Sequence, residues 1–84
     1  MTEVVIYTTP TCHFCEEAKK LLNSLAIPFK TVDVQSDHKA RMHMIEISKS
    51  MGVPVIEIDG KVIVGADKLE SYLSERLYGR NKVS

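Results

Sequence analysis

The two cysteines of the chain lie close together in the segment Thr8-Thr9-Pro10-Thr11-Cys12-His13-Phe14-Cys15. This segment follows an apolar run typical of a strand and precedes a helical pattern. A cysteine in the first turn of a helix meets unpaired backbone N–H groups and the positive end of the helix dipole, and both stabilise a thiolate. Such sites lower a cysteine pKa from about 8.5 to roughly 3.5–7.5. Because the thiolate attacks disulfides, we predict thiol–disulfide exchange, with Cys12 as the nucleophile and Cys15 as the resolving thiol.

His13 stands between the two cysteines and admits two interpretations. In the first, its imidazole stabilises the Cys12 thiolate and makes the pair more oxidising. In the second, it is an exposed polar residue with little effect on the sulfur chemistry. A change of reduction potential or of Cys12 pKa in His13→Pro would distinguish them.

A zinc site is the main competing interpretation of the cysteines. His38 and His43 have a spacing that zinc ligands allow. The interval between Cys15 and His38, however, exceeds the roughly 12 to 15 residues of a zinc finger and holds a helix and a strand. We therefore expect both histidines to be exposed at the start of a second helix, and we predict no metal. Two inert buried thiols are a further alternative.

Length and charge narrow the classes of function. The 84 residues suit one domain over residues 1–84, and the polar tail 79–84 is expected to fray. Eleven basic and eleven acidic residues balance, which argues against a nucleic-acid partner. No apolar run reaches the roughly 20 residues of a membrane span. The acidic start does not resemble a signal peptide, and two cysteines close together suit a catalytic pair in the reducing cytoplasm, where we expect the protein. Nothing in the sequence indicates a stable oligomer, so we expect a monomer.

Apolar spacing predicts three helices and four strands. We expect the second helix to end at Gly52. Its buried face should carry Ala40, Met44, Ile47 and Met51. The Asp59-Gly60 pair indicates a two-residue hairpin, and the first two strands should pair in parallel. The order βαβαββα implies an α/β fold with a four-stranded mixed sheet flanked by helices. The expected strands span residues 4–7, 29–34, 53–58 and 61–64, and the helices span about 12–25, 37–51 and 67–77.

This order, with a cysteine pair after the first strand, resembles the thioredoxin fold. Three segments resemble glutaredoxins more closely: the run from Val5 to Leu22 around the cysteines, Gly52-Val53-Pro54, and Val64-Gly65-Ala66-Asp67-Lys68-Leu69. They occur in the family's order, and the resemblance covers essentially the whole chain. It implies a glutaredoxin-like thiol–disulfide oxidoreductase that acts on protein or glutathione mixed disulfides.

The resemblance also implies a binding site. Val53–Pro54 would be a cis peptide whose Val53 main chain pairs with a peptide or with glutathione. The turn at Gly65 would offer N–H groups to a glutathione carboxylate. Glutathione would be a co-substrate, with no tightly bound cofactor, and disulfide-containing proteins would be the partners. The implied contacts are Thr9, His13, Phe14 as a groove wall, Val53, Pro54, Gly65, Ala66 and Asp67.

The sequence departs from the family at positions that hold glutathione. Thr9 replaces a common lysine, and Met51 replaces a common arginine. Val64 replaces the first glycine of a pair, and Lys68 replaces an acid. Compensation by Lys19, Lys49 or Lys68 is conceivable on charge alone. The electron donor therefore stays open between glutathione and thioredoxin reductase, and a non-catalytic binding module is the alternative from another class.

Overall fold

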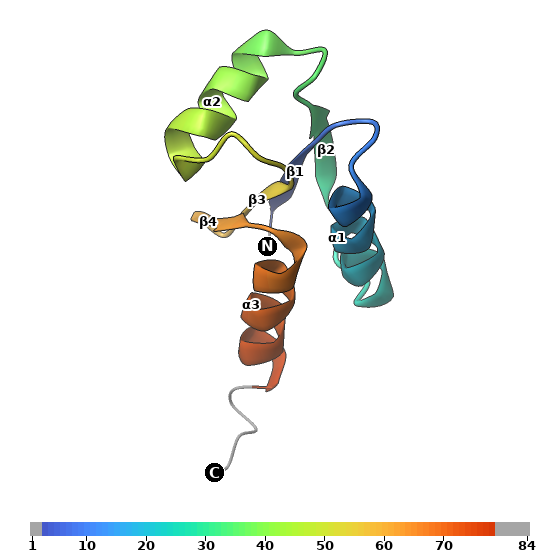
Figure 1. The fold of residues 1–84 in the computed structure, drawn as a ribbon. Helices are drawn as coiled ribbons and strands as arrows, with labels where there is room; N and C mark the ends of the chain where they lie inside the picture. The colour runs from blue at the N-terminus through green and yellow to red at the C-terminus, as the bar shows by residue number, and fades with distance from the viewer. Residues whose placement is uncertain (1–2, 79–84) are drawn as a thin grey trace.

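Three helices and four strands follow one another in the predicted βαβαββα order (Figure 1). The structure is a computed structural model and describes residues 3–78; the expected fraying of residues 79–84 lies outside this range. None of the helices in the described part is long and apolar enough to cross a membrane. The elements are β1 Val4–Thr8, α1 His13–Ser24, β2 Lys30–Asp33, α2 His38–Ser48, β3 Val55–Ile58, β4 Lys61–Val64 and α3 Ala66–Tyr78.

The four strands form one mixed sheet in the order β2-β1-β3-β4. β1 pairs in parallel with β2, and Ile6 lies opposite Thr31. The pairs β1–β3 and β3–β4 are antiparallel. Asp59 and Gly60 join β3 to β4 with φ angles of 51° and 80°, the left-handed values that a two-residue hairpin turn of type I′ requires. The predicted hairpin and the parallel first pair are confirmed.

One face of the sheet is covered by α1 and α3, which lie side by side in Figure 1. Strand side chains alternate between the two faces, so Val4 and Ile6 point to this side. Ala18 and Leu22 of α1 lie four residues apart and pack on the strands together with α3. This larger core consists of Val4, Ile6, Ala18, Leu22, Ile56, Ile58, Ile63, Leu69 and Leu73.

The opposite face carries α2 and a smaller core (Figure 1). Its buried members are Tyr7, Val34, Met44 and Val55. The Tyr7 hydroxyl donates a hydrogen bond of 3.2 Å to Glu57 Oε1. Burial of the phenol, the negative charge of Glu57 and this hydrogen bond together raise the pKa of Tyr7 above its ordinary value.

The end of α2 differs from the prediction. The helix ends at Ser48, and Lys49 adopts the left-handed conformation with φ 58°, so Gly52 is not the terminating residue. The Lys49 N–H donates to the Ile45 carbonyl at 2.8 Å and closes the last turn. Met51 therefore lies beyond the helix with 68% of its surface exposed, and its predicted place on the buried face is wrong. β3 also begins at Val55, after the proline.

Candidate active site

The two cysteines form a disulfide at the start of α1. Cys12 is the N-cap residue, and its Sγ accepts a hydrogen bond of 3.0 Å from the Cys15 backbone N–H. The Cys12 N–H in turn donates to the Thr9 carbonyl at 3.3 Å. Cys12 is half-buried, whereas Cys15 is completely buried. An incoming group therefore reaches Cys12 first, and a negative charge on Cys12 Sγ would meet a backbone donor and the helix dipole.

The loop before β3 is linked to the turn before α3. The Val53–Pro54 peptide bond is cis, and Pro54 is buried. The Gly65 N–H donates to the Pro54 carbonyl at 3.0 Å, which joins two segments that are separate in the sequence. The structure thus brings together Val53, Pro54 and Gly65, three of the residues that the family resemblance implied.

Gly65 adopts a left-handed φ of 101° at the turn into α3. The turn requires glycine because of this conformation, since a Cβ atom at this position would meet only the end of the exposed Asp67 side chain, at 2.9 Å. α3 begins at Ala66, and the amides of its first turn have no acceptors within the helix. These amides can bind an anion, as the resemblance implied for Gly65, Ala66 and Asp67.

A groove on the α2 side of the disulfide contains Thr9 and Val53, and we call it the α2-side groove. It also contains Arg41, which sequence reasoning did not identify. Arg41 precedes the buried Met44 by three residues, so the helical period places both on one face, and that spacing was the available signal. Lys19, Lys49 and Lys68 do not line this groove. Its lining residues are Thr9, Val34, Gln35, Arg41, Met44, Met51 and Val53.

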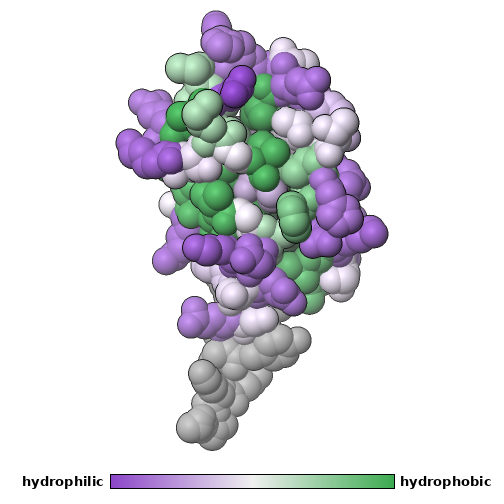
Figure 2. Space-filling view, viewed as in Figure 1, coloured by the Kyte–Doolittle hydropathy of each residue, from purple (hydrophilic) through white to green (hydrophobic). Residues whose placement is uncertain are grey.

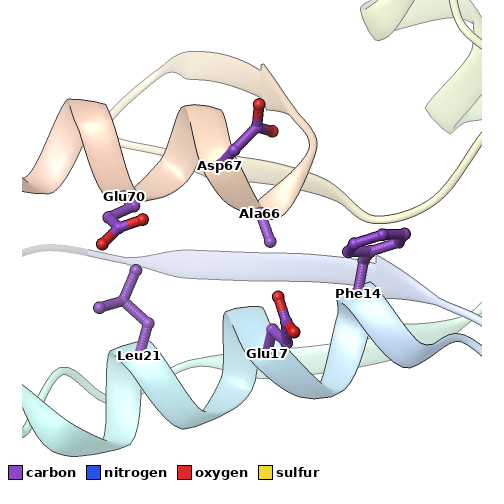
Figure 3. A pocket seen from close by; sticks show the side chains of 6 residues that line it. All are labelled: Phe14, Glu17, Leu21, Ala66, Asp67 and Glu70. Atoms are coloured by element: carbon purple, nitrogen blue, oxygen red, sulfur yellow. The ribbon is translucent and has the colours of Figure 1, made fainter.

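A second groove, the α1–α3 groove, lies between the two helices (Figure 3). Phe14 lies at its end nearest the cysteines, is 59% exposed and forms part of the wall of this groove. In Figure 3, Glu17 and Leu21 of α1 face Ala66 and Glu70 of α3 across the groove. The full lining is Phe14, Glu17, Leu21, Ala66, Asp67 and Glu70. Glu17, Leu21 and Glu70 were missed because their meeting depends on how two distant helices pack.

His13 lies at the surface, and among the described residues it contacts its own helix. Its Nε2 is 3.2 Å from Glu17 Oε2, one turn further along α1. Its ring also meets the Phe14 ring edge-on, with centroids 5.6 Å apart. These contacts hold the imidazole toward the α1–α3 groove. Whether His13 stabilises the Cys12 thiolate or has little effect on the sulfur chemistry therefore stays a prediction.

His38 and His43 lie exposed on α2, as expected. Within residues 3–78, no group of three or more histidine, cysteine, aspartate or glutamate side chains is placed to hold a metal ion. His43 instead contacts the Tyr7 ring, with ring centroids 6.2 Å apart. The structure thus gives His43 a packing contact against the smaller core.

The fold and the cysteine pair define a class: a small thioredoxin-fold protein with a dithiol site. The family model described as glutaredoxin matches residues 4–63. The chain is 49% identical to a glutaredoxin-like 8.6 kDa protein of the rubredoxin operon of Clostridium pasteurianum, covering 80% of this chain and 89% of that one. It is 39% identical to glutaredoxin 3 of Escherichia coli, covering 82% and 83% of the two chains.

A solved structure gives the same result. The dithiolic glutaredoxin 2-C-Grx1 of Trypanosoma brucei brucei superposes with a TM-score of 0.74 at 29% identity, covering 86% of this chain and 77% of that chain. The chain therefore belongs to the glutaredoxin family. It is a thiol–disulfide oxidoreductase whose dithiol is the Cys12–Cys15 pair. The predicted family, fold and general activity are confirmed.

Proposed function

We propose that Cys12 is the attacking thiol, that Cys15 is the resolving thiol, and that glutathione is the electron donor. The observation that carries the assignment is the asymmetry of the two sulfurs. Cys12 Sγ sits at the helix N-terminus and accepts the Cys15 N–H at 3.0 Å, while Cys15 is fully buried behind it. A thiolate at Cys12 is stabilised by that donor and by the helix dipole.

The proposed cycle balances in two exchange steps. The Cys12 thiolate attacks a client disulfide, forms a mixed disulfide and releases one client thiolate. Cys15 then loses its proton and attacks the Cys12 sulfur, which releases the second client thiolate and forms the Cys12–Cys15 disulfide. Two glutathione molecules reverse these steps on the protein and leave as glutathione disulfide. Two electrons thus pass from glutathione to the client.

The charges beside the cysteines support glutathione as the donor. Glutathione carries a carboxylate at each end, with its thiol between them. Arg41 in the α2-side groove offers a guanidinium to one carboxylate, in place of the lysine and arginine that Thr9 and Met51 replace. The free amides at the start of α3 suit the carboxylate of the glutamyl end, and the Asp67 carboxylate beside them suits the ammonium of the same end. Val53 lines the α2-side groove with Arg41, and the next residue, Pro54, accepts the Gly65 N–H, so the Val53 main chain can pair with the tripeptide backbone.

The deciding measurement is an NADPH-coupled disulfide reduction assay, run once with glutathione and glutathione reductase and once with thioredoxin reductase. Turnover with glutathione supports the proposal. In that assay Arg41→Met should raise the KM for glutathione about 2- to 5-fold, the range of an exposed ion pair. Lys39→Met, on the same helix but outside the α2-side groove, should leave it unchanged. An equal KM for both variants would contradict the role of Arg41.

Thioredoxin reductase is a second candidate donor, because Thr9 and Met51 stand where glutaredoxins commonly have two cations that hold glutathione. Turnover with thioredoxin reductase alone would make the protein a thioredoxin-like carrier and overturn the glutathione assignment. For either donor, we propose that the protein works as a monomer in the reducing cytoplasm, where a reactive dithiol is kept reduced. Size-exclusion chromatography and fractionation of cells test these two points.

A further inference from the structure

The α1–α3 groove extends well beyond the two sulfur atoms. Leu21 lies nine residues after Cys12, which is about 13 Å along the helix at 1.5 Å per residue. The groove thus runs from Phe14, beside the cysteines, to Leu21 and Glu70, well down both helices (Figure 3). Neither the attack on Cys12 nor its resolution by Cys15 needs these distant residues.

We infer that the α1–α3 groove docks the client protein and selects disulfides flanked by an apolar residue and by lysine or arginine. This inference rests on the proposed function, because it assumes that the client's disulfide reaches Cys12. It names the kind of polypeptide that the established activity takes as its substrate.

The apolar part of the groove is open to a partner. Phe14 has 59% of its surface exposed, although large aromatic side chains are usually well covered. Leu21 and Ala66 are only partly buried against the core, and they form the apolar lining next to Phe14. Figure 2 shows apolar side chains at the surface in the middle of the view, among hydrophilic ones. An apolar client side chain beside the disulfide would bury the exposed ring of Phe14 and the lining that Leu21 and Ala66 form.

The negative charge of the α1–α3 groove favours a basic residue in the client. Glu17, Asp67 and Glu70 contribute carboxylates, and no lysine or arginine is among the described residues that line it. Within the described range, the Asp67 and Glu70 carboxylates have no hydrogen-bond or ion-pair partner. Among the described residues, Glu17 pairs only with the exposed imidazole of His13. A lysine or arginine in the client would pair with these carboxylates, and an acidic segment would be repelled.

The positive charge of the α2-side groove supports a basic occupant for the α1–α3 groove. Arg41 makes that groove the cationic one, so the two sides of the disulfide carry opposite charge. A client with its basic residues on one side of its disulfide is thereby held in one orientation. Electrostatic complementarity of this kind contributes specificity more than affinity.

The test uses the full chain and two synthetic peptides, each closed by one internal disulfide. One has leucine and two arginines beside a cysteine, and the other has leucine and two glutamates at the same places. We expect a higher kcat/KM for the basic peptide. The Glu17→Gln/Glu70→Gln double variant should lower the basic-to-acidic ratio about 2- to 5-fold for each carboxylate removed. The wild-type ratio should also fall as salt is raised.

Controls separate the inference from the activity on which it rests. Glu75→Gln removes a carboxylate from the exposed part of α3 outside the groove, so the ratio should stay at the wild-type value. Each rate is divided by the rate with bis(2-hydroxyethyl) disulfide, which carries no charge. Equal ratios for wild type and the double variant overturn the docking surface while the activity stands. No reduction of any of the three disulfides overturns the proposed function itself.

Discussion

The two sulfurs occupy different surroundings although only two residues separate them. Cys12 is half-buried at the helix tip, while Cys15 has no exposed surface. An external disulfide can therefore contact Cys12, whereas Cys15 can reach only a sulfur already bonded to Cys12. The order of attack follows from this accessibility.

This order predicts different products for two single substitutions. Cys15→Ser should still form a mixed disulfide at Cys12 but should not resolve it, so the protein accumulates a covalent client or glutathione adduct. Cys12→Ser should form no adduct and lose turnover, because the buried Cys15 is not reached. Mass spectrometry of both variants after exposure to glutathione disulfide measures the adduct. An adduct on Cys12→Ser with none on Cys15→Ser would reverse the assignment.

Tyr7 gives a pH-dependent prediction. Its pKa is raised by burial, by the charge of Glu57 and by their hydrogen bond. The unfolded chain therefore releases the phenol proton near pH 10, before the folded protein does. Tyr7 thus favours the folded state below about pH 10, and this contribution is lost as the pH rises through the raised pKa. Urea unfolding between pH 8 and 11 should show a steeper loss of stability in wild type than in Tyr7→Phe. Parallel curves of stability against pH for the two proteins would contradict this role of Tyr7.

The reacting residues were predictable from the sequence, while several binding residues were not. The spacing of Cys12 and Cys15 and their place before a helical pattern determine the chemistry locally. The roles of Arg41 and Glu70 depend on which surfaces α2 and α3 present to other segments, and no local pattern states that. Met51 was misplaced because the helix was continued to the nearest glycine.

At the scale of the elements, helix ends explain the remaining disagreement. The N-terminal end of α2 lies where it was expected, and the Asp37 side chain caps it by accepting the Ala40 N–H at 3.0 Å. The other end was assigned to Gly52, since glycine is the usual left-handed residue after a helix. Lys49 takes that conformation instead. Ser48 reinforces this end, because its hydroxyl donates to the Met44 carbonyl at 2.6 Å and accepts the Ser50 N–H at 3.1 Å.

Lys49 therefore offers a stabilising substitution. A side chain with a Cβ atom is strained at φ 58°, and glycine is not. Lys49→Gly should raise the free energy of unfolding by about 0.5 to 1 kcal/mol, the strain relief less the added entropy of the unfolded chain. Met42→Gly, at an exposed position in the interior of the same helix, should lower it by about 1 kcal/mol. Urea titration measures both, and a loss of stability in both variants would contradict the strain at Lys49.

At the scale of the whole molecule, the sheet separates two cores of unequal size. The larger one joins α1 and α3 to the strands, and the smaller one holds α2. The cysteines stand at the start of α1, while the α2-side groove is formed with α2. The site thus depends on both cores, because each core positions one side of the disulfide. The βαβαββα order made it predictable that helices cover both faces of the sheet, since apolar side chains alternate between the faces and each apolar face must be buried.

Truncating one side chain in each core separates their roles. Leu22→Ala and Met44→Ala each remove a fully buried side chain and should cost about 2 to 5 kcal/mol of unfolding free energy. Leu22 lies on α1, which carries the cysteines, so its truncation should slow reduction of bis(2-hydroxyethyl) disulfide. Met44 lines the α2-side groove, so its truncation should raise the KM for glutathione more than it changes that rate. Urea unfolding and both assays, run at a temperature where each variant is folded, measure this. Equal effects of the two variants on both assays would show that the cores act as one unit.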